Sequence, residues 1–191
     1  MLNLMDFPFQ YFPKYFDPTG IKDKLLSQIP LQSDTIIIGR GDNAKVVPEK
    51  RKTAWLSDNS KLHFEYSGKV MVPIPIPPFI HTIKSKLYED FGIEFDGILI
   101  NYYENGDCGM GYHSDPVEDK WTTDFIILSI GASREFVFRN KKDKDTKITY
   151  TLNNGDLIYM FDKCQDDYEH RVKKDKTDMD NRISLVFKKS A

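Results

Sequence analysis

Two histidines and one aspartate are spaced in this sequence as the ligands of a metal ion would be. His113 and Asp115 lie two residues apart in Gly111–Asp115, which we expect to be a strand, so that both side chains project to the same face. His170 follows in another expected strand near the end of the chain. Two histidines and a carboxylate on one side of a metal form the facial triad of non-heme iron(II) oxygenases. This triad leaves coordination positions open for a co-substrate and O₂.

Arg182 opens the last expected strand, Arg182–Lys188. Strand alternation places Ser184, Val186 and Lys188 on the same face as Arg182. An arginine that points into a β-barrel needs a carboxylate, because an unpaired buried charge is very costly. A dicarboxylic co-substrate would supply one in bidentate geometry. The alternative is a structural ion pair with an acid elsewhere in the chain.

The elements that would carry these residues have the spacing of an all-β core. Short strand-like runs separated by turn signals fill the chain from residue 96 onward, which predicts two sheets with a ligand site at their mouth. Before residue 96 we expect two helices, one that follows Asp17–Pro18 and one that follows Pro77–Pro78 and ends at Gly92. The fold class predicted is therefore α+β. Residues 96–191 would form a double-stranded β-helix (jelly-roll) catalytic core, and residues 1–95 an N-terminal extension of the same domain with its helices packed on one side.

Composition limits the class of protein. The chain has 191 residues, a net charge of −2 and two cysteines without CxxC spacing, which excludes a disulfide scaffold and a Cys-rich zinc site. The apolar N-terminus lacks a basic start, so we expect no secretion signal, and no apolar run is long enough to span a membrane. We expect an intracellular protein in a reducing compartment, the nucleus or the cytoplasm, that is monomeric and does not bind membranes.

Several motifs, in order, resemble the AlkB-type Fe(II)/2-oxoglutarate nucleic-acid demethylases over residues 45–189. Asn101-Tyr102-Tyr103, Gly106 and His113-Ser114-Asp115 are similar to the family's N-x-Y…G…H-x-D. The segment 129–139 resembles its SLGA-x-R-x-F-x-F-R stretch, and residues 152–157 resemble its L-x-x-G-[SD]-L turn. His170 and Arg182 match the distal histidine and the co-substrate arginine. These matches are far more specific than the metal-ligand spacing alone.

The resemblance implies cofactors, roles and a reaction. Fe(II) would be held by His113, Asp115 and His170, with 2-oxoglutarate and O₂ as co-substrates and ascorbate as reductant. Arg182 would hold the far carboxylate of 2-oxoglutarate, and Asn101 and Tyr103 would form hydrogen bonds with the co-substrate. The substrate would be an N-alkylated base in DNA or RNA, which loses its alkyl group as an aldehyde.

Two departures from the family pattern concern the site. The family ends its last strand R-x-N-L-T-F-R, whereas this chain has Ser184, Val186 and Lys188 in place of the polar pair and the second arginine. We expect Ser184 and Lys188 to remain near the co-substrate, with Lys188 as a point charge. Many members carry a second acid soon after H-x-D. Here Pro116-Val117 intervene and the first acid is Glu118, which we assign to the substrate side.

We expect strands at Thr35–Ile38 and Leu62–Tyr66, joined by the polar stretch Gly39–Ser60. The segment Gly39–Tyr66 is the expected substrate lid. Trp55, Phe64 and Tyr66 would cover the base and Arg51 would bind phosphate. The alternative is that these aromatics are core residues and the basic residues are ordinary surface. For the whole chain, the alternatives are the same dioxygenase chemistry on a protein, lipid or small molecule, and an inactive nucleic-acid-binding domain.

Overall fold

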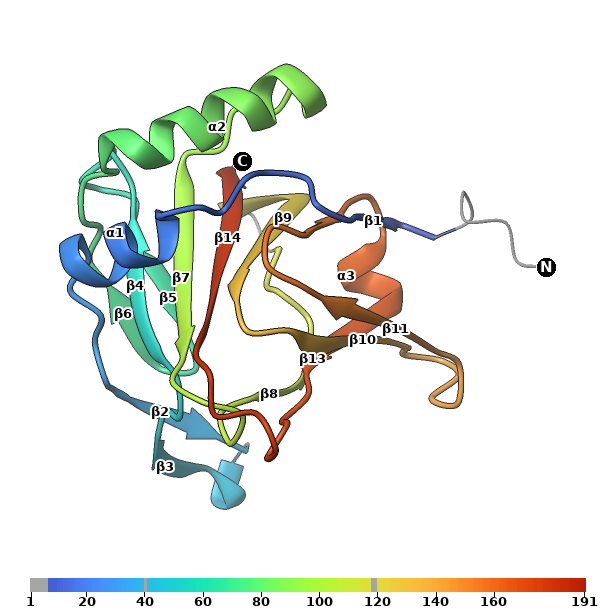
Figure 1. Ribbon diagram of the computed structural model, residues 1–191. Coiled ribbons are helices and arrows are strands. Elements are labelled where there is room, and N and C mark those ends of the chain that lie inside the picture. The colour runs from blue at the N-terminus through green and yellow to red at the C-terminus, as the bar shows by residue number, and fades with distance from the viewer. Residues whose placement is uncertain (1–6, 40, 118–119) are drawn as a thin grey trace.

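Antiparallel strands dominate the structure, a computed structural model that describes residues 7–39, 41–117 and 120–191 (Figure 1). The larger sheet has the strand order β1 (Phe9–Phe12), β12 (Leu157–Met160), β9 (Trp121–Gly131), β14 (Arg182–Ser190), β7 (Gly97–Tyr103), β4 (Lys52–Leu56). The smaller sheet has the order β11 (Lys147–Leu152), β10 (Arg134–Asn140), β13 (Tyr168–Val172), β8 (Met110–His113). The fold is mostly β with few helices, as a jelly roll requires.

One cluster of buried side chains fills the space between the two sheets. Tyr103, Phe125 and Val186 from the larger sheet meet Phe136 and Phe138 from the smaller one. Figure 1 shows β10, β11 and β13 to one side of the strands β7 and β14, with α1 and β4 to the other side. The strand faces that are predicted to carry the site point into this interior.

A second cluster of buried side chains lies on the other face of the larger sheet. It combines Leu25 of α1 (Ile21–Gln28) and Ile80 of α2 (Pro78–Phe91) with sheet residues such as Ile98 and Leu185. The larger sheet therefore has apolar side chains packed against both of its faces. No helix in the described part of the chain is both long and apolar enough to cross a membrane.

The helix ends were predicted with mixed success. α2 ends as expected, because Gly92 adopts the left-handed conformation and its N–H donates to the carbonyl of Tyr88. The predicted start of α1 is wrong. The carboxylate of Asp17 accepts hydrogen bonds from the backbone N–H and the hydroxyl of Thr19, which makes a local turn. The helix begins only after Gly20, whose φ is 70°.

The polar stretch between the two expected N-terminal strands contains further strands. β2 (Thr35–Ile38) pairs with β3 (Lys45–Pro48), across a loop that contains the 3₁₀ helix Gly41–Asn43, and β5 (Phe64–Tyr66) pairs with β6 (Lys69–Met71). β4 joins the larger sheet beside β7. This part of the expected lid thus belongs to the core, and only the two hairpins remain as candidates for a lid.

Candidate metal and co-substrate site

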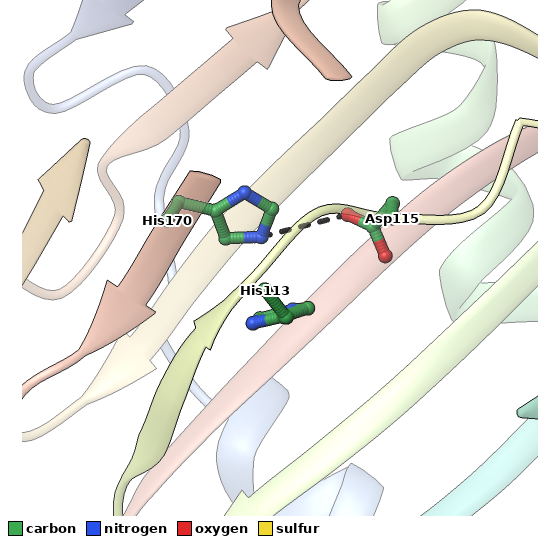
Figure 2. A group of neighbouring side chains, drawn as sticks. All are labelled: His113, Asp115 and His170. Atoms are coloured by element: carbon green, nitrogen blue, oxygen red, sulfur yellow. Dashed lines mark ion pairs between the residues drawn. The ribbon is translucent and has the colours of Figure 1, made fainter. Parts of the chain in front are cut away.

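His113, Asp115 and His170 come together at one end of the smaller sheet. β8 and β13 are neighbours, and their register places His113 directly opposite His170, with 4.3 Å between the ring centroids. Asp115 lies just beyond β8, with its Oδ2 3.6 Å from Nε2 of His170. One possible ligand atom from each residue lies within 4.8 Å of the other two (Figure 2). The spacing recognised in the sequence therefore corresponds to a cluster in space.

The protonation states of these residues suit a metal ion. Burial lowers the pKa of His170 to about 3, helped by repulsion from His113. Desolvation also lowers the pKa of His113. Burial alone would raise the pKa of Asp115, but the Lys188 ammonium and the two imidazoles outweigh it and hold that pKa far below its usual range. Neutral imidazoles and an ionised carboxylate are the forms that bind metal.

Neighbouring groups orient each member of the triad. Nδ1 of His113 lies 3.0 Å from the carbonyl of Gly111, a contact that favours a proton on Nδ1 and leaves Nε2 free to bind metal. The backbone N–H of Asp115 donates to Oε1 of Gln165, at 2.8 Å. Gln165 is a buried residue of α3 (Cys164–Asp167), and nothing in the sequence pattern singled it out. The ring of Phe136 stacks on His170, with centroids 5.2 Å apart.

Lys188 contacts a triad member instead of lying with Arg182. Its Nζ is fully buried, 3.1 Å from Oδ1 of Asp115 and 4.0 Å from the ring centroid of Phe125. We expected this cation at the co-substrate, but Lys188 is not among the residues that line the cavity around Arg182. The ammonium of Lys188 contacts Oδ1 of Asp115, whereas Oδ2 of the same carboxylate lies near His170.

A small cavity of about 40 Å³ between the sheets adjoins the triad and is lined by the residues predicted to bind the co-substrate, except Lys188. Its lining includes the three triad residues together with Asn101, Tyr103, Arg182 and Ser184. β14 carries Arg182 and Ser184 directly opposite Tyr103 and Asn101 of β7. The predicted strand alternation is therefore confirmed for these side chains.

Arg182 is completely buried, and most of its hydrogen-bonding capacity is unused. Nε donates to Oγ of Ser129 at 3.0 Å, whereas Nη1 and Nη2 have no hydrogen-bond partner among the described residues. No described carboxylate forms an ion pair with this guanidinium, so the alternative of a structural ion pair has no support there. Oδ1 of Asn101 is also buried and has no hydrogen-bond partner in the part of the chain that the structure describes. A carboxylate bound in this cavity would satisfy the free fork of the guanidinium.

A larger pocket of about 850 Å³ opens beside the triad. His113 and Asp115 form part of its lining, and the aromatic side chains Phe64, Tyr66 and Trp121 form another part. The pocket is thus placed to present a bulky substrate to a metal held by the triad.

The other predicted substrate residues differ in their placement. Trp55 is only 1% exposed, donates from Nε1 to the carbonyl of Leu62 and stacks behind Phe64, so it is a core residue and not a pocket residue. Arg51 is mostly buried and forms an ion pair with Glu49 at 2.9 Å. Glu118 lies outside the described residues.

Comparison with known proteins identifies the family. The sequence model of the 2OG-Fe(II) oxygenase superfamily matches residues 9–188. The chain belongs to this superfamily. It is therefore a 2-oxoglutarate-dependent dioxygenase whose cofactors are Fe(II), 2-oxoglutarate and O₂, and both the triad and the unpaired guanidinium of Arg182 fit that set.

Individual relatives point to the AlkB-like branch. The chain is 34% identical to the uncharacterized protein R406 of Acanthamoeba polyphaga mimivirus, covering 95% of this chain and 93% of the relative. It is 31% identical to the human alpha-ketoglutarate-dependent dioxygenase alkB homolog 3 (88% of this chain, 60% of the relative) and 26% identical to the mouse DNA oxidative demethylase ALKBH2 (75% and 62%). The chain thus spans less than two thirds of these alkB relatives. The solved structure of OsALKBH1 shares the fold, with a TM-score of 0.65 and 16% identity over 96% of this chain and 98% of that one.

Proposed function

We propose that this dioxygenase oxidatively removes N-alkyl groups from bases of DNA or RNA. The observation that carries the proposal is the pocket of about 850 Å³ beside the triad, whose lining includes the aromatic residues Phe64, Tyr66 and Trp121. An enzyme that acts on a base takes it from a single strand or flips it from a duplex and stacks it on such side chains. Similarity to a DNA oxidative demethylase supports the same substrate class.

In this proposal each site residue has one role. His113, Asp115 and His170 bind Fe(II), and Lys188 fixes the carboxylate of Asp115 through Oδ1. Arg182 takes the far carboxylate of 2-oxoglutarate on Nη1 and Nη2, while Asn101, Tyr103 and Ser184 line the same cavity. Bound Fe(II), 2-oxoglutarate and O₂ together supply the oxidation of an alkyl C–H bond, after which the hydroxylated alkyl group leaves as an aldehyde.

The chain itself contributes orientation and exclusion of water. The cavity around Arg182 lies between the two sheets, so apolar residues such as Ile127, Phe136 and Val172 shield it from solvent. Low polarity there strengthens the contact of the guanidinium with a carboxylate. We also propose that residues 96–191 form the catalytic core, that residues 1–95 contribute its supporting helices and the substrate wall, and that the protein acts as a monomer in the nucleus or cytoplasm.

The same chemistry on a protein, lipid or small molecule is the main alternative. The expected basic lid offers less support for nucleic acid than its sequence indicated, because Arg51 is paired with Glu49. The aromatic wall is left as the main local argument for a base. The complete triad and the unpaired Arg182 speak against an inactive binding domain.

Succinate release tests the proposal. The protein with Fe(II), ascorbate and 2-oxoglutarate would be offered methylated single-stranded DNA, duplex DNA and RNA, in parallel with peptide and fatty-acid pools. We expect a methylated oligonucleotide to stimulate succinate release and to lose its methyl group as formaldehyde, and His170→Ala to abolish both. Stimulation by peptides or fatty acids alone would replace the nucleic-acid proposal with the alternative.

A further inference from the structure

Two short hairpins form one wall of the large pocket. β2 contributes Ile36–Ile38 to the lining and β5 contributes Phe64–Tyr66. Each hairpin is a separate two-stranded sheet, not a part of either main sheet. The backbone N–H of Ile37 donates to the carbonyl of Ser67 at 2.9 Å, so the hairpins touch where they border the pocket. Something else has to hold these small sheets in place, since two strands alone are marginally stable.

The ammonium group of Lys69 lies at the point where both hairpins meet the larger sheet. The Lys69 side chain is 7% exposed, and its Nζ lies 2.6 Å from Oδ2 of Asp34 and 3.4 Å from Oε2 of Glu49. It also donates to Oγ1 of Thr53, at 2.6 Å. Asp34 precedes β2 and Glu49 follows β3, and their backbones are joined by a hydrogen bond from the N–H of Glu49 to the carbonyl of Asp34. One cation on β6 therefore reaches the base of the other hairpin and strand β4.

Glu49 continues the network to the pocket. Its carboxylate accepts the hydroxyl hydrogen bond of Tyr66, with both oxygens at 2.9 Å, and pairs with Nε of Arg51 at 2.9 Å. Its side chain is 3% exposed. Two cations, Lys69 and Arg51, thus balance the carboxylates of Glu49 and Asp34. Because its hydroxyl is engaged with Glu49, Tyr66 is left with its ring to present to the pocket.

We propose that Lys69 is a positioning residue that locks the two hairpins onto the larger sheet and fixes the ring of Tyr66 in the wall of the substrate pocket, both through Glu49 and through its own contact with the Tyr66 hydroxyl. The wall is then preformed, so substrate binds without having to order it. Removing one partner of a buried ion pair strongly destabilises the fold, because the other charge remains buried without compensation. The identity of the substrate rests on the proposed function, whereas the locking of the wall does not.

Amide hydrogen exchange tests the lock without any substrate. The amide of Ile37 donates to the other hairpin, and the amide of Glu49 donates to Asp34 at the base of its own hairpin. In Lys69→Met both amides should exchange roughly tenfold faster than in the wild type, while amides of β9 and β14 keep their rates. The matched control is Lys86→Met, which removes an exposed ion pair with Asp90 on α2. It should leave the exchange rates of the hairpin amides and of the β9 and β14 amides unchanged. Should Lys69→Met not fold, Asp34→Asn is the milder variant for the same measurement. Unchanged protection of Ile37 and Glu49 in a folded variant would overturn the proposal.

Kinetics test the consequence for the pocket. With a methylated oligonucleotide, Lys69→Met should raise KM by roughly tenfold, whereas the apparent affinity for 2-oxoglutarate and its uncoupled turnover stay as in the wild type. If Lys69 acts through Glu49 on Tyr66, the effects of Lys69→Met and Tyr66→Phe should not add in the double variant. Equal losses in both activities, or fully additive effects, would refute positioning. If the wild type turns over no oligonucleotide, the proposed function fails, but the exchange measurement still decides the role of Lys69.

Discussion

At the scale of single residues, Arg182 carries a charge that no described residue compensates. The side chain is completely buried, and both Nη atoms lack a partner among the described residues. Desolvation lowers the pKa of this guanidinium, with Arg134 adding to the effect. Such a residue costs stability in the free protein, and a bound dicarboxylate would remove that cost.

Arg182→Lys should therefore weaken 2-oxoglutarate binding while it leaves metal binding intact. Lysine keeps a charge but loses the two-pronged donor, and charge-assisted hydrogen bonds are worth about 1.5–3 kcal/mol, so the apparent affinity should fall roughly 10- to 150-fold. Titration of 2-oxoglutarate at saturating metal measures this. Thermal unfolding of ligand-free Arg182→Met separates the alternatives. A co-substrate arginine predicts unchanged or higher stability, whereas a clear loss would make Arg182 a structural ion-pair residue after all.

Replacing Lys188 should destabilise the ligand-free protein, whereas replacing Arg182 should not. Its ammonium is bonded to the carboxylate of Asp115, so Lys188→Met leaves that buried charge without a cation and should cost about 3–5 kcal/mol. A divalent metal at the triad would compensate Asp115, so the metal should raise the unfolding temperature of the variant more than that of the wild type. The apparent affinity for 2-oxoglutarate at saturating metal should change little. A large fall in that affinity would return Lys188 to the co-substrate role we first expected.

At the scale of elements, strand alternation explains why the sequence could predict which side chains share the inner faces of β14 and β7. Residues 182, 184 and 188 share the inner face of β14, and residues 101 and 103 share that of β7, because a strand repeats every two residues. Alternation identifies a face but not a partner. It could not show that Lys188 meets Asp115, 73 residues away, or that Gln165 holds the backbone of the same aspartate.

Strands β1 and β4 were missed for a related reason. β1 is a four-residue run near the N-terminus, and β4 begins with Lys52 and Thr53, so neither has a strong local strand signal. Both become strands because a neighbour offers an open edge, β12 to β1 and β7 to β4. Such pairing depends on residues far away in the sequence, and tertiary context outweighs local propensity there.

Two aromatic residues of β5 should respond differently to truncation. Phe64 is 2% exposed and stacks on Trp55, so Phe64→Ala should destabilise the fold by about 3–5 kcal/mol. Tyr66 is only partly buried, so Tyr66→Ala should cost about 1–3 kcal/mol in oligonucleotide binding with a smaller loss of stability. Thermal unfolding and binding at one fixed salt concentration measure both quantities. If Tyr66→Ala loses affinity only in proportion to lost stability, its ring is a core residue and the nucleic-acid proposal loses its main local support.

At the scale of the whole molecule, the site joins the two sheets. His113 and His170 belong to the smaller sheet, whereas Arg182, Asn101 and Lys188 belong to the larger one. A metal at the triad and a dicarboxylate on Arg182 would therefore connect both sheets across the core. Each ligand would bind only the folded arrangement, since no part of the chain brings these groups together when unfolded.

Ligand binding should consequently stabilise the entire fold. A ligand at about 100 times its Kd contributes about 2.7 kcal/mol, which corresponds to an increase of roughly 5–10 °C in unfolding temperature for a chain of this size. We expect Fe(II) without O₂ to give one such increase and 2-oxoglutarate added with it to give a second. Thermal unfolding followed by circular dichroism measures both.

Two variants assign the increases to their sites. Arg182→Met should keep the increase from metal and lose the increase from 2-oxoglutarate, because only the free guanidinium fork is removed. His170→Ala should lose the increase from metal, because a facial triad has no spare protein ligand. A wild-type protein that unfolds at the same temperature with and without both ligands would show that the cavity between the sheets does not bind them. If 2-oxoglutarate still raises the unfolding temperature of Arg182→Met, another cation must bind the carboxylate of 2-oxoglutarate.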